Sequence, residues 1–355
     1  MRPPVSQKGR ASVSNRTGRF ESFKHEDFDD GWGTLDAPQE KIQTTLTIDN
    51  AKTVISYNQS PDLRFDRSIN PYRGCEHGCV YCYARPAHTW LGLSAGLDFE
   101  SRLFYKPEIA ACLRAELSHK KYRCRPIAVG VNTDAYQPVE RKLGLTRKSL
   151  EVLAEAQHPV LMITKSSLIE RDLDILAEMA RSNLVHASVS VTTLDRNIAR
   201  QLEPRAAAPQ RRLDTVAKLT EAGIPTSVTV APLIPVLTDA ELESILSAAK
   251  QAGAISAGYV LLRLPHEIRD LFEEWLQVHA PLKAAHVMSR IRDCRAGKEN
   301  DPNFQSRLRG TGAYASLLEQ RFGLACEKLK FGTMPILNTE LFKPPEPVIG
   351  QLSLF

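Results

Sequence analysis

Apolar and β-branched runs alternate with stretches of helical periodicity through the middle of the chain. One such stretch places Ile169, Leu173, Leu176 and Ala180 on a single helical face. Strands that alternate with helices indicate βα units and a parallel sheet. The pattern therefore predicts an α/β fold, a partial TIM barrel of about six βα units that is left partly open. The predicted strands are one just before Cys75 and those at 126–133, 159–165, 184–192, 224–231 and 257–264.

Two helix starts fit the capping-box pattern, in which a Ser or Thr precedes a Glu by one helical turn. Ser167 with Glu170 and Thr238 with Glu241 have this spacing. We therefore expect helices to begin at these residues, with the first free backbone N–H groups bonded to the Ser or Thr side chain.

Composition divides the chain into four parts. A polar, largely irregular N-terminal extension occupies residues 1–58, and the core domain is expected at 59–282. A basic, mainly helical C-terminal extension follows at 283–332. Residues 333–355 are rich in proline and predict a flexible, extended tail.

The 355 residues, 43% hydrophobic and 25% charged, have the composition of an ordinary globular protein. The longest uncharged stretch, 222–238, is interrupted by prolines and is too short and polar for a membrane span. The first residues lack the apolar segment of a secretory signal. We therefore expect a cytoplasmic protein that has no membrane partner.

Positive charge is concentrated at two places. Residues 1–24 hold six Lys or Arg and one Glu, which account for the whole formal charge of +5 and leave the body nearly neutral. Residues 287–310 hold six cationic and three acidic side chains. This second stretch is either a phosphate-contacting edge for nucleic acid or an ordinary surface of ion pairs, and charge alone leaves both open.

The chain has seven cysteines, an odd number at uneven spacing, which argues against a disulfide framework. Three of them, Cys75, Cys79 and Cys82, lie in one short glycine-containing loop. A structural zinc site would need a fourth ligand, whereas a 4Fe–4S cube held by three thiolates would keep one iron open for chemistry. The candidates for a fourth zinc ligand are His77, His88 and Cys112.

Polar residues gather where the predicted strands end. Thr133 and Asp134 close the second strand, Lys165 closes the third, and Ser188, Ser190 and Thr192 alternate with valines along the fourth. In a parallel barrel the carboxyl ends of the strands carry the chemistry, and alternate residues face the lumen. The pattern predicts a lumen that binds a polar ligand, with Lys165, Asp134 and Ser190 offering a cation, an acceptor and a hydroxyl.

The cysteine spacing, with Tyr81 directly before the last thiol, resembles the signature of the radical SAM superfamily. From about Ser60 to about residue 265 the chain resembles the subgroup related to spore photoproduct lyase, the DNA repair photolyase-like proteins. The stretches that carry this resemblance are 75–85, 132–140, 164–166, 188–192, 202–205 and 231–232.

The resemblance implies an enzyme of the lyase or oxidoreductase class that uses a 4Fe–4S cluster and S-adenosylmethionine. Cys75, Cys79 and Cys82 would hold the cluster, and an electron from a donor such as flavodoxin or ferredoxin would release a 5′-deoxyadenosyl radical. The residues that would bind or lie beside S-adenosylmethionine are Tyr81, Thr133, Asp134, Lys165, Ser190, Gln137 and Glu140.

One position departs from that family. Spore photoproduct lyase uses a cysteine on its second strand to return a hydrogen atom to the product radical. The corresponding residue here is Val131, which has no hydrogen to donate in this way. Cys124, just upstream, is the candidate substitute, although a lone cysteine is also a common packing residue.

The chain ends in Gln351, Leu352, Ser353, Leu354 and Phe355, which resemble the short peptide by which bacterial proteins dock on the DNA polymerase sliding clamp. We therefore expect a radical SAM enzyme that acts on damaged or modified DNA and is recruited by the clamp. Two alternatives stay open: a radical SAM enzyme that modifies RNA, protein or a small molecule, and a metal-stabilised clamp-binding module without catalysis.

Overall fold

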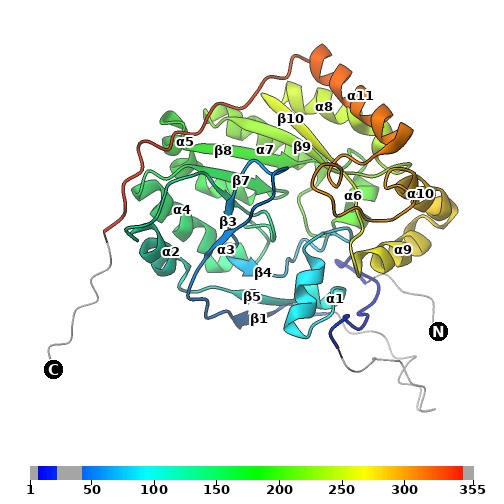
Figure 1. The fold of residues 1–355 in the computed structure, drawn as a ribbon, viewed down its shortest axis with the longest axis horizontal. Helices are drawn as coiled ribbons and strands as arrows, with labels where there is room; N and C mark the ends of the chain where they lie inside the picture. The colour runs from blue at the N-terminus through cyan, green and yellow to red at the C-terminus, as the bar shows by residue number, and fades with distance from the viewer. Residues whose placement is uncertain (1–6, 22–41, 347–355) are drawn as a thin grey trace.

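The computed structural model describes residues 7–21 and 42–346. Its main sheet has seven strands in the order β10-β9-β8-β7-β6-β3-β2, and all neighbouring pairs from β3 to β10 are parallel. Figure 1 shows helices along the outer side of this curved sheet. The strands are β2 (Ile55–Tyr57), β3 (Arg67–Ile69), β6 (Ile127–Val129), β7 (Val160–Thr164), β8 (Val185–Ser190), β9 (Thr226–Leu233) and β10 (Ser256–Leu261). The six parallel strands confirm the predicted partial barrel.

The strand expected just before Cys75 is split in two. The first barrel strand is β3, whereas β4 (Tyr72–Arg73), directly before the cysteine loop, leaves the barrel. It pairs antiparallel with β5 (Arg102–Tyr105), which in turn pairs parallel with β1 (Thr45–Ile48) in a separate small sheet. The cysteine loop therefore begins at the junction of the two sheets.

The helices alternate with the parallel strands and continue beyond them. Those before and within the barrel are η2 (Arg85–Leu91), α1 (Leu97–Ser101), α2 (Ile109–Leu117), α3 (Glu140–Leu143), α4 (Leu145–Glu155), η3 (Ser167–Asp172), α5 (Leu173–Arg181), α6 (Arg196–Leu202), α7 (Pro209–Glu221), η4 (Asp239–Glu241) and α8 (Leu242–Gln251). The C-terminal ones are α9 (Ile268–His279), α10 (Pro281–Asp293) and α11 (Gly312–Lys328). Within residues 7–21 and 42–346, no helix has the length and apolar character that a bilayer span requires.

Neither predicted capping box forms. At η3 the cap is Ser166, whose hydroxyl accepts the Leu168 N–H, while Glu170 is drawn outward to the guanidinium of Arg211. At η4, the Thr238 hydroxyl bonds backward to the N–H of Ile234. In both places another hydrogen-bond partner replaces the expected one, although the helices begin within one residue of the predicted positions.

Residues 7–21 of the N-terminal extension lie along α1 and α9 (Figure 1). Arg16 forms ion pairs with Asp270 and Glu274, at 3.0 and 2.5 Å, and Arg19 lies 3.6 Å from Glu267. These carboxylates all belong to α9 or the residue before it. This part of the basic arm is therefore neutralised by the protein itself.

The basic stretch 287–310 is largely ion-paired as well, which favours the second of its two interpretations. Arg292 lies 2.9 Å from Glu299, and Arg307 makes two 2.6 Å contacts with Asp62. Arg295 is buried and donates to four backbone carbonyls. Most of the cations described in this stretch are therefore engaged by partners within the chain.

Residues 332–345 form a strap along the amino ends of the barrel strands. Backbone N–H groups of Gly332, Asn338 and Lys343 donate to carbonyls that come just before β10, β8 and β7. The ring of Phe342 packs between Tyr122 and His158. The flexibility predicted for 333–355 is therefore wrong for this stretch, because the strap satisfies its backbone on the barrel; residues 347–355 lie outside the described residues.

The strap leads to a stability prediction. Phe342→Ala removes a ring from an aromatic cluster and should lower the free energy of unfolding by about 1–3 kcal/mol. Ile336→Ala is the matched control on the same strap, because Ile336 is 92% exposed and should change stability by less than about 0.5 kcal/mol. Urea denaturation followed by circular dichroism measures both. Equal effects of the two substitutions would contradict the proposed anchoring by Phe342.

Candidate functional site

The cysteine loop between β4 and η2 brings the three thiols close together. Cys75 and Cys79 are buried and Cys82 is partly exposed. The three lie near enough that a charge on one raises the pKa of another. Among the described residues, no three His, Cys, Asp or Glu side chains converge on a position for one metal ion. A 4Fe–4S cube needs no such convergence, because each cysteine binds a separate iron.

Burial makes these thiols hard to ionise without a metal. Burial, followed by the charge of Asp134, raises the pKa of Cys75 well above its ordinary value. Burial and then the Glu203 carboxylate raise the pKa of Cys79 to about 12. Both are therefore protonated at neutral pH in the metal-free protein, and iron must displace their protons on binding. Thiolates are soft ligands, so three of them in one loop suit an iron–sulfur cluster whose irons share the thiolate charge.

Two glycines allow the loop to approach its neighbours closely. Gly74 and Gly78 have positive φ values of 78° and 67°. A Cβ on Gly78 would lie 2.7 Å from the carboxylate of Glu100, and one on Gly74 would lie 2.9 Å from the Phe99 carbonyl oxygen. Any other residue at these positions would push the loop away from α1.

Arg85 and Glu100 form a fully buried ion pair beneath the loop. The guanidinium also donates to the carbonyls of Gly78 and Cys79, at 2.9 and 2.8 Å. The two carboxylate oxygens of Glu100 also accept the backbone N–H groups of Ala11 and Ser12 from the N-terminal segment. The pair therefore fixes the backbone between the first two thiols and connects it to the arm.

Asp134 serves the loop as a structural anchor. Its carboxylate accepts the Thr164 hydroxyl and the Lys165 backbone N–H at 2.8 Å each, and it lies 3.3 Å from Nδ1 of His77. Burial raises the pKa of Asp134, but His77 and these donors outweigh it and lower that pKa to about 2. The predicted cofactor residue thus joins the ends of β6 and β7 to the cysteine loop, with its oxygens already engaged.

Gln137 and Thr133 hold the start of the same loop. The Gln137 amide accepts the Glu76 N–H at 2.8 Å and donates to the Gly74 carbonyl at 3.1 Å. The Thr133 hydroxyl donates to the Tyr72 carbonyl at 2.9 Å. The predicted Thr133 contact with S-adenosylmethionine could therefore use only the remaining lone pairs of this hydroxyl.

Tyr81 leads to a second buried charge pair. Its hydroxyl and that of Thr192 both donate to Glu203, whose other oxygen accepts from Arg212. Burial raises the pKa of Glu203, but the Arg212 guanidinium and the Lys165 ammonium outweigh it and lower that pKa to about 2. The Lys165 ammonium lies over the Tyr81 ring, 5.9 Å from its centroid. Tyr81, Lys165 and Cys79 are thus brought together, with a permanent negative charge behind them.

Ser190 lies at the end of β8 and is buried. Its carbonyl accepts from Arg212 at 3.1 Å, while its neighbour Ser188 shares a 2.9 Å hydrogen bond with Thr229 of β9. Alternate residues of a strand share a face, so the Ser190 hydroxyl lies on the same face as Ser188 and Thr192. No side-chain hydrogen bond of Ser190 occupies that hydroxyl among the described residues, and it is free to meet a ligand.

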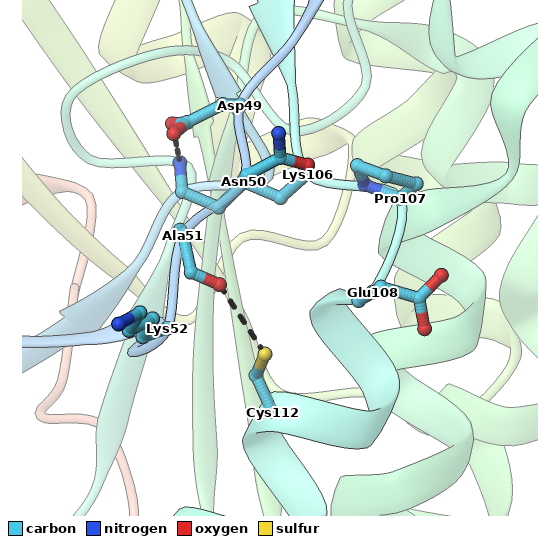
Figure 2. Close-up of a pocket in the computed structure, with 8 residues that line it drawn as sticks. All are labelled: Asp49, Asn50, Ala51, Lys52, Lys106, Pro107, Glu108 and Cys112. Carbon is cyan, nitrogen blue, oxygen red and sulfur yellow. Dashed lines mark hydrogen bonds and ion pairs between the residues drawn. The ribbon is translucent and has the colours of Figure 1, made fainter.

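The fourth-ligand candidates for zinc are engaged elsewhere. His77 faces Asp134, and Nε2 of His88 lies 3.0 Å from the Arg102 carbonyl. Cys112 donates to the Ala51 carbonyl in a cavity of about 370 Å³ at the start of α2, which Figure 2 shows. Cys112 is the one predicted candidate that lines this cavity, whose other lining residues beside Ala51 are Asp49, Asn50, Lys52, Lys106, Pro107 and Glu108.

Val131 follows β6, and its carbonyl accepts the hydroxyl of Tyr83, the residue after Cys82. Cys124 lies before β6, at the opposite end of that strand, near Arg67 and Tyr122. The candidate substitute thiol is therefore at the amino edge of the barrel, away from the cysteine loop. This position does not support Cys124 as the substitute hydrogen donor.

Arg212 and Glu100, which complete the two buried ion pairs, cannot be identified as site residues from the sequence. Each is a charged residue that would ordinarily be assigned to a helix surface. A buried charged residue could be inferred only from the lack of an oppositely charged residue one helical turn away. Many exposed residues share that feature, so it does not identify a buried pair.

Residues 69–249 match the family model of the Radical SAM superfamily. An uncharacterized protein of Mycobacterium bovis is 35% identical over 250 residues, 70% of this chain and 72% of its own length. The Radical SAM Nα-GlyT isomerase of Pseudomonas phage M6 is 25% identical over 205 residues, which are 54% of this chain and 40% of that protein.

Solved structures show the same fold at low identity. A mutant of spore photoproduct lyase superposes with a TM-score of 0.57 at 14% identity, over 80% of this chain and 79% of the other. Spore photoproduct lyase complexed with dinucleoside spore photoproduct gives a TM-score of 0.54 at 15% identity over the same shares. At 14–15% identity, these structural matches establish the fold alone.

The buried pair behind Tyr81 can be tested by a double-mutant cycle. Glu203→Ala leaves the Arg212 guanidinium buried without a counter-ion and should lower the free energy of unfolding by about 3–5 kcal/mol. Adding Arg212→Met should recover much of that loss, because no uncompensated charge then remains. Denaturant unfolding of the two single variants and the double variant measures the coupling. Additive losses would contradict a mutual role for the pair.

Proposed function

Because the chain belongs to the radical SAM superfamily, whose enzymes use a 4Fe–4S cluster and S-adenosylmethionine, we propose that it acts on damaged or modified DNA. Cys75, Cys79 and Cys82 hold the cluster. When bound, the cluster and S-adenosylmethionine supply a 5′-deoxyadenosyl radical that removes a hydrogen atom from the substrate. The observation that carries the proposal is the barrel shared with spore photoproduct lyase over 80% of the chain.

Two relatives support DNA as the substrate class. Spore photoproduct lyase has been solved in complex with a dinucleoside photoproduct, and the phage relative is by name an isomerase of Nα-GlyT. At the cysteine loop, the Tyr83 ring is 48% exposed, which suits stacking with a base. A base would have to leave its duplex stack to reach such a ring beside a buried loop.

The chain's own residues divide the work of cofactor binding. The Lys165 ammonium, already beside Tyr81, offers a cation to the carboxylate of S-adenosylmethionine, and the free Ser190 hydroxyl offers a hydrogen bond. Asp134 and Gln137 hold the loop in shape. Val131 has no S–H or O–H group, so the reaction does not end with the hydrogen transfer that spore photoproduct lyase uses at the corresponding place.

Recruitment by the sliding clamp adds to the DNA affinity of a body that is nearly neutral. The cations of the described arm and of residues 287–310 are largely neutralised by partners within the chain. The strap runs along the amino edge of the barrel, whereas the cysteine loop lies at the carboxyl edge.

The cofactor chemistry and the substrate class can be tested together. Anaerobically reconstituted protein, given flavodoxin or dithionite, should release 5′-deoxyadenosine from S-adenosylmethionine, and ultraviolet-damaged DNA should raise the rate. Cys75→Ala, Cys79→Ala or Cys82→Ala should abolish release, because each removes a thiolate ligand. Cys326→Ala, in α11, is the matched control and should keep it. Stimulation by RNA, protein or small molecules in place of DNA would overturn the assigned substrate class.

The tail prediction separates recruitment from catalysis. A chain that lacks residues 351–355 should lose binding to an immobilised bacterial sliding clamp, because Leu352, Leu354 and Phe355 are its apolar anchors. Its iron content and release of 5′-deoxyadenosine on free oligonucleotides should stay at the full-length level. Surface plasmon resonance measures the binding. Undiminished clamp binding by the shortened chain would refute this recruitment.

A further inference from the structure

Arg263 stands at the carboxyl edge of the barrel, just after β10. Its guanidinium lies over the Tyr83 ring, 5.4 Å from the centroid. Tyr83 directly follows Cys82 and bonds to the Val131 carbonyl across the mouth. Arg263 therefore borders the place where a substrate must approach the cysteine loop.

No acceptor satisfies this guanidinium. Within residues 7–21 and 42–346, Arg263 forms no hydrogen bond or ion pair. The nearest carboxylate, Asp62, is already held by Arg307 through two 2.6 Å contacts. Burial, followed by the charge of Arg307, lowers the pKa of Arg263, so its environment opposes its charge.

Other buried arginines of this protein are treated differently. Arg85 and Arg212 each donate to carbonyls and to a buried carboxylate, and Arg295 donates to four carbonyls. A half-buried cation that lacks such partners is costly unless an external anion completes it. The contrast singles out Arg263 as a ligand-binding group.

The surroundings of Arg263 fit one strand of a nucleic acid. A guanidinium presents a planar fork that matches two phosphate oxygens. The exposed rings of Tyr83 and Phe304, 48% and 46% exposed, lie at Arg263 and Arg307 respectively and offer faces for bases. Arg307, although paired with Asp62, adds positive potential to the same edge.

We propose that Arg263 binds a backbone phosphate of the substrate strand at the mouth of the barrel, and so positions the neighbouring nucleotide at the cysteine loop. This inference rests on the proposed action on DNA and deepens it. The contact gives affinity and position without reading sequence.

The test uses reconstituted holoenzyme and a fluorescent single-stranded oligonucleotide, with binding followed by anisotropy over a range of salt. Arg263→Gln should weaken binding about tenfold and reduce the slope of affinity against salt by about one charge. Arg263→Lys should recover part of the affinity. Arg181→Gln, an exposed arginine paired with Glu178 at the far edge, is the matched control and should change neither quantity.

A second arm identifies the phosphate itself. Single phosphates of the oligonucleotide are replaced by uncharged methylphosphonates. At one position the replacement should lower the affinity of wild type, and it should not change the affinity of Arg263→Gln. Iron content and circular dichroism check that each variant is folded and loaded. If wild type binds but Arg263→Gln binds equally well with the same salt slope, this inference fails and the proposed function stands. If wild type binds no oligonucleotide even at low salt, this inference fails, while the effect of damaged DNA on release of 5′-deoxyadenosine still decides the proposed function separately.

Discussion

The structure depends on one electrostatic constraint, which is that three thiols share a buried loop where their ionised forms repel one another. Apolar packing cannot stabilise three ionised thiols, because burial strengthens the repulsion between their charges. A metal group that places positive charge beside each sulfur removes that repulsion. The loop must therefore be held in place by contacts that do not depend on the sulfurs.

Those contacts come from widely separated parts of the chain. Arg85 and Glu100 fix the loop from below, Gln137 and Asp134 hold it from the ends of β6 and β7, and Glu203 holds Tyr81 between the last two thiols. Buried ion pairs add little net stability but are costly to break, so they favour one geometry over others. The same logic explains why the N-terminal arm, which caps Glu100, belongs to the site although it is distant in sequence.

Sequence reasoning succeeded where a signal is local or periodic. The six parallel strands follow from apolar runs, and the loop of Cys75, Cys79 and Cys82 follows from spacing alone. It failed where hydrogen-bond partners compete: the predicted capping boxes at Ser167 and Thr238 do not form, because Ser166 caps η3 and the Thr238 hydroxyl accepts the Ile234 N–H instead. The long-range contacts of the two terminal segments could not be predicted either, because nothing near Arg16 or Phe342 in the sequence identifies α9 or His158 as a partner. Asp134 is predicted as a cofactor residue, and the fold shows that its oxygens contact the cysteine loop and the end of β7.

The central claim, that this loop holds a cube with one iron open, is tested most directly by spectroscopy of the anaerobically reconstituted chain. Chemical analysis should find about four iron and four sulfide per chain. After reduction, electron paramagnetic resonance should show a 4Fe–4S signal that changes when S-adenosylmethionine is added, since the cofactor alters the open iron. Zinc in place of iron, or an iron–sulfur signal that is indifferent to S-adenosylmethionine, would contradict the account.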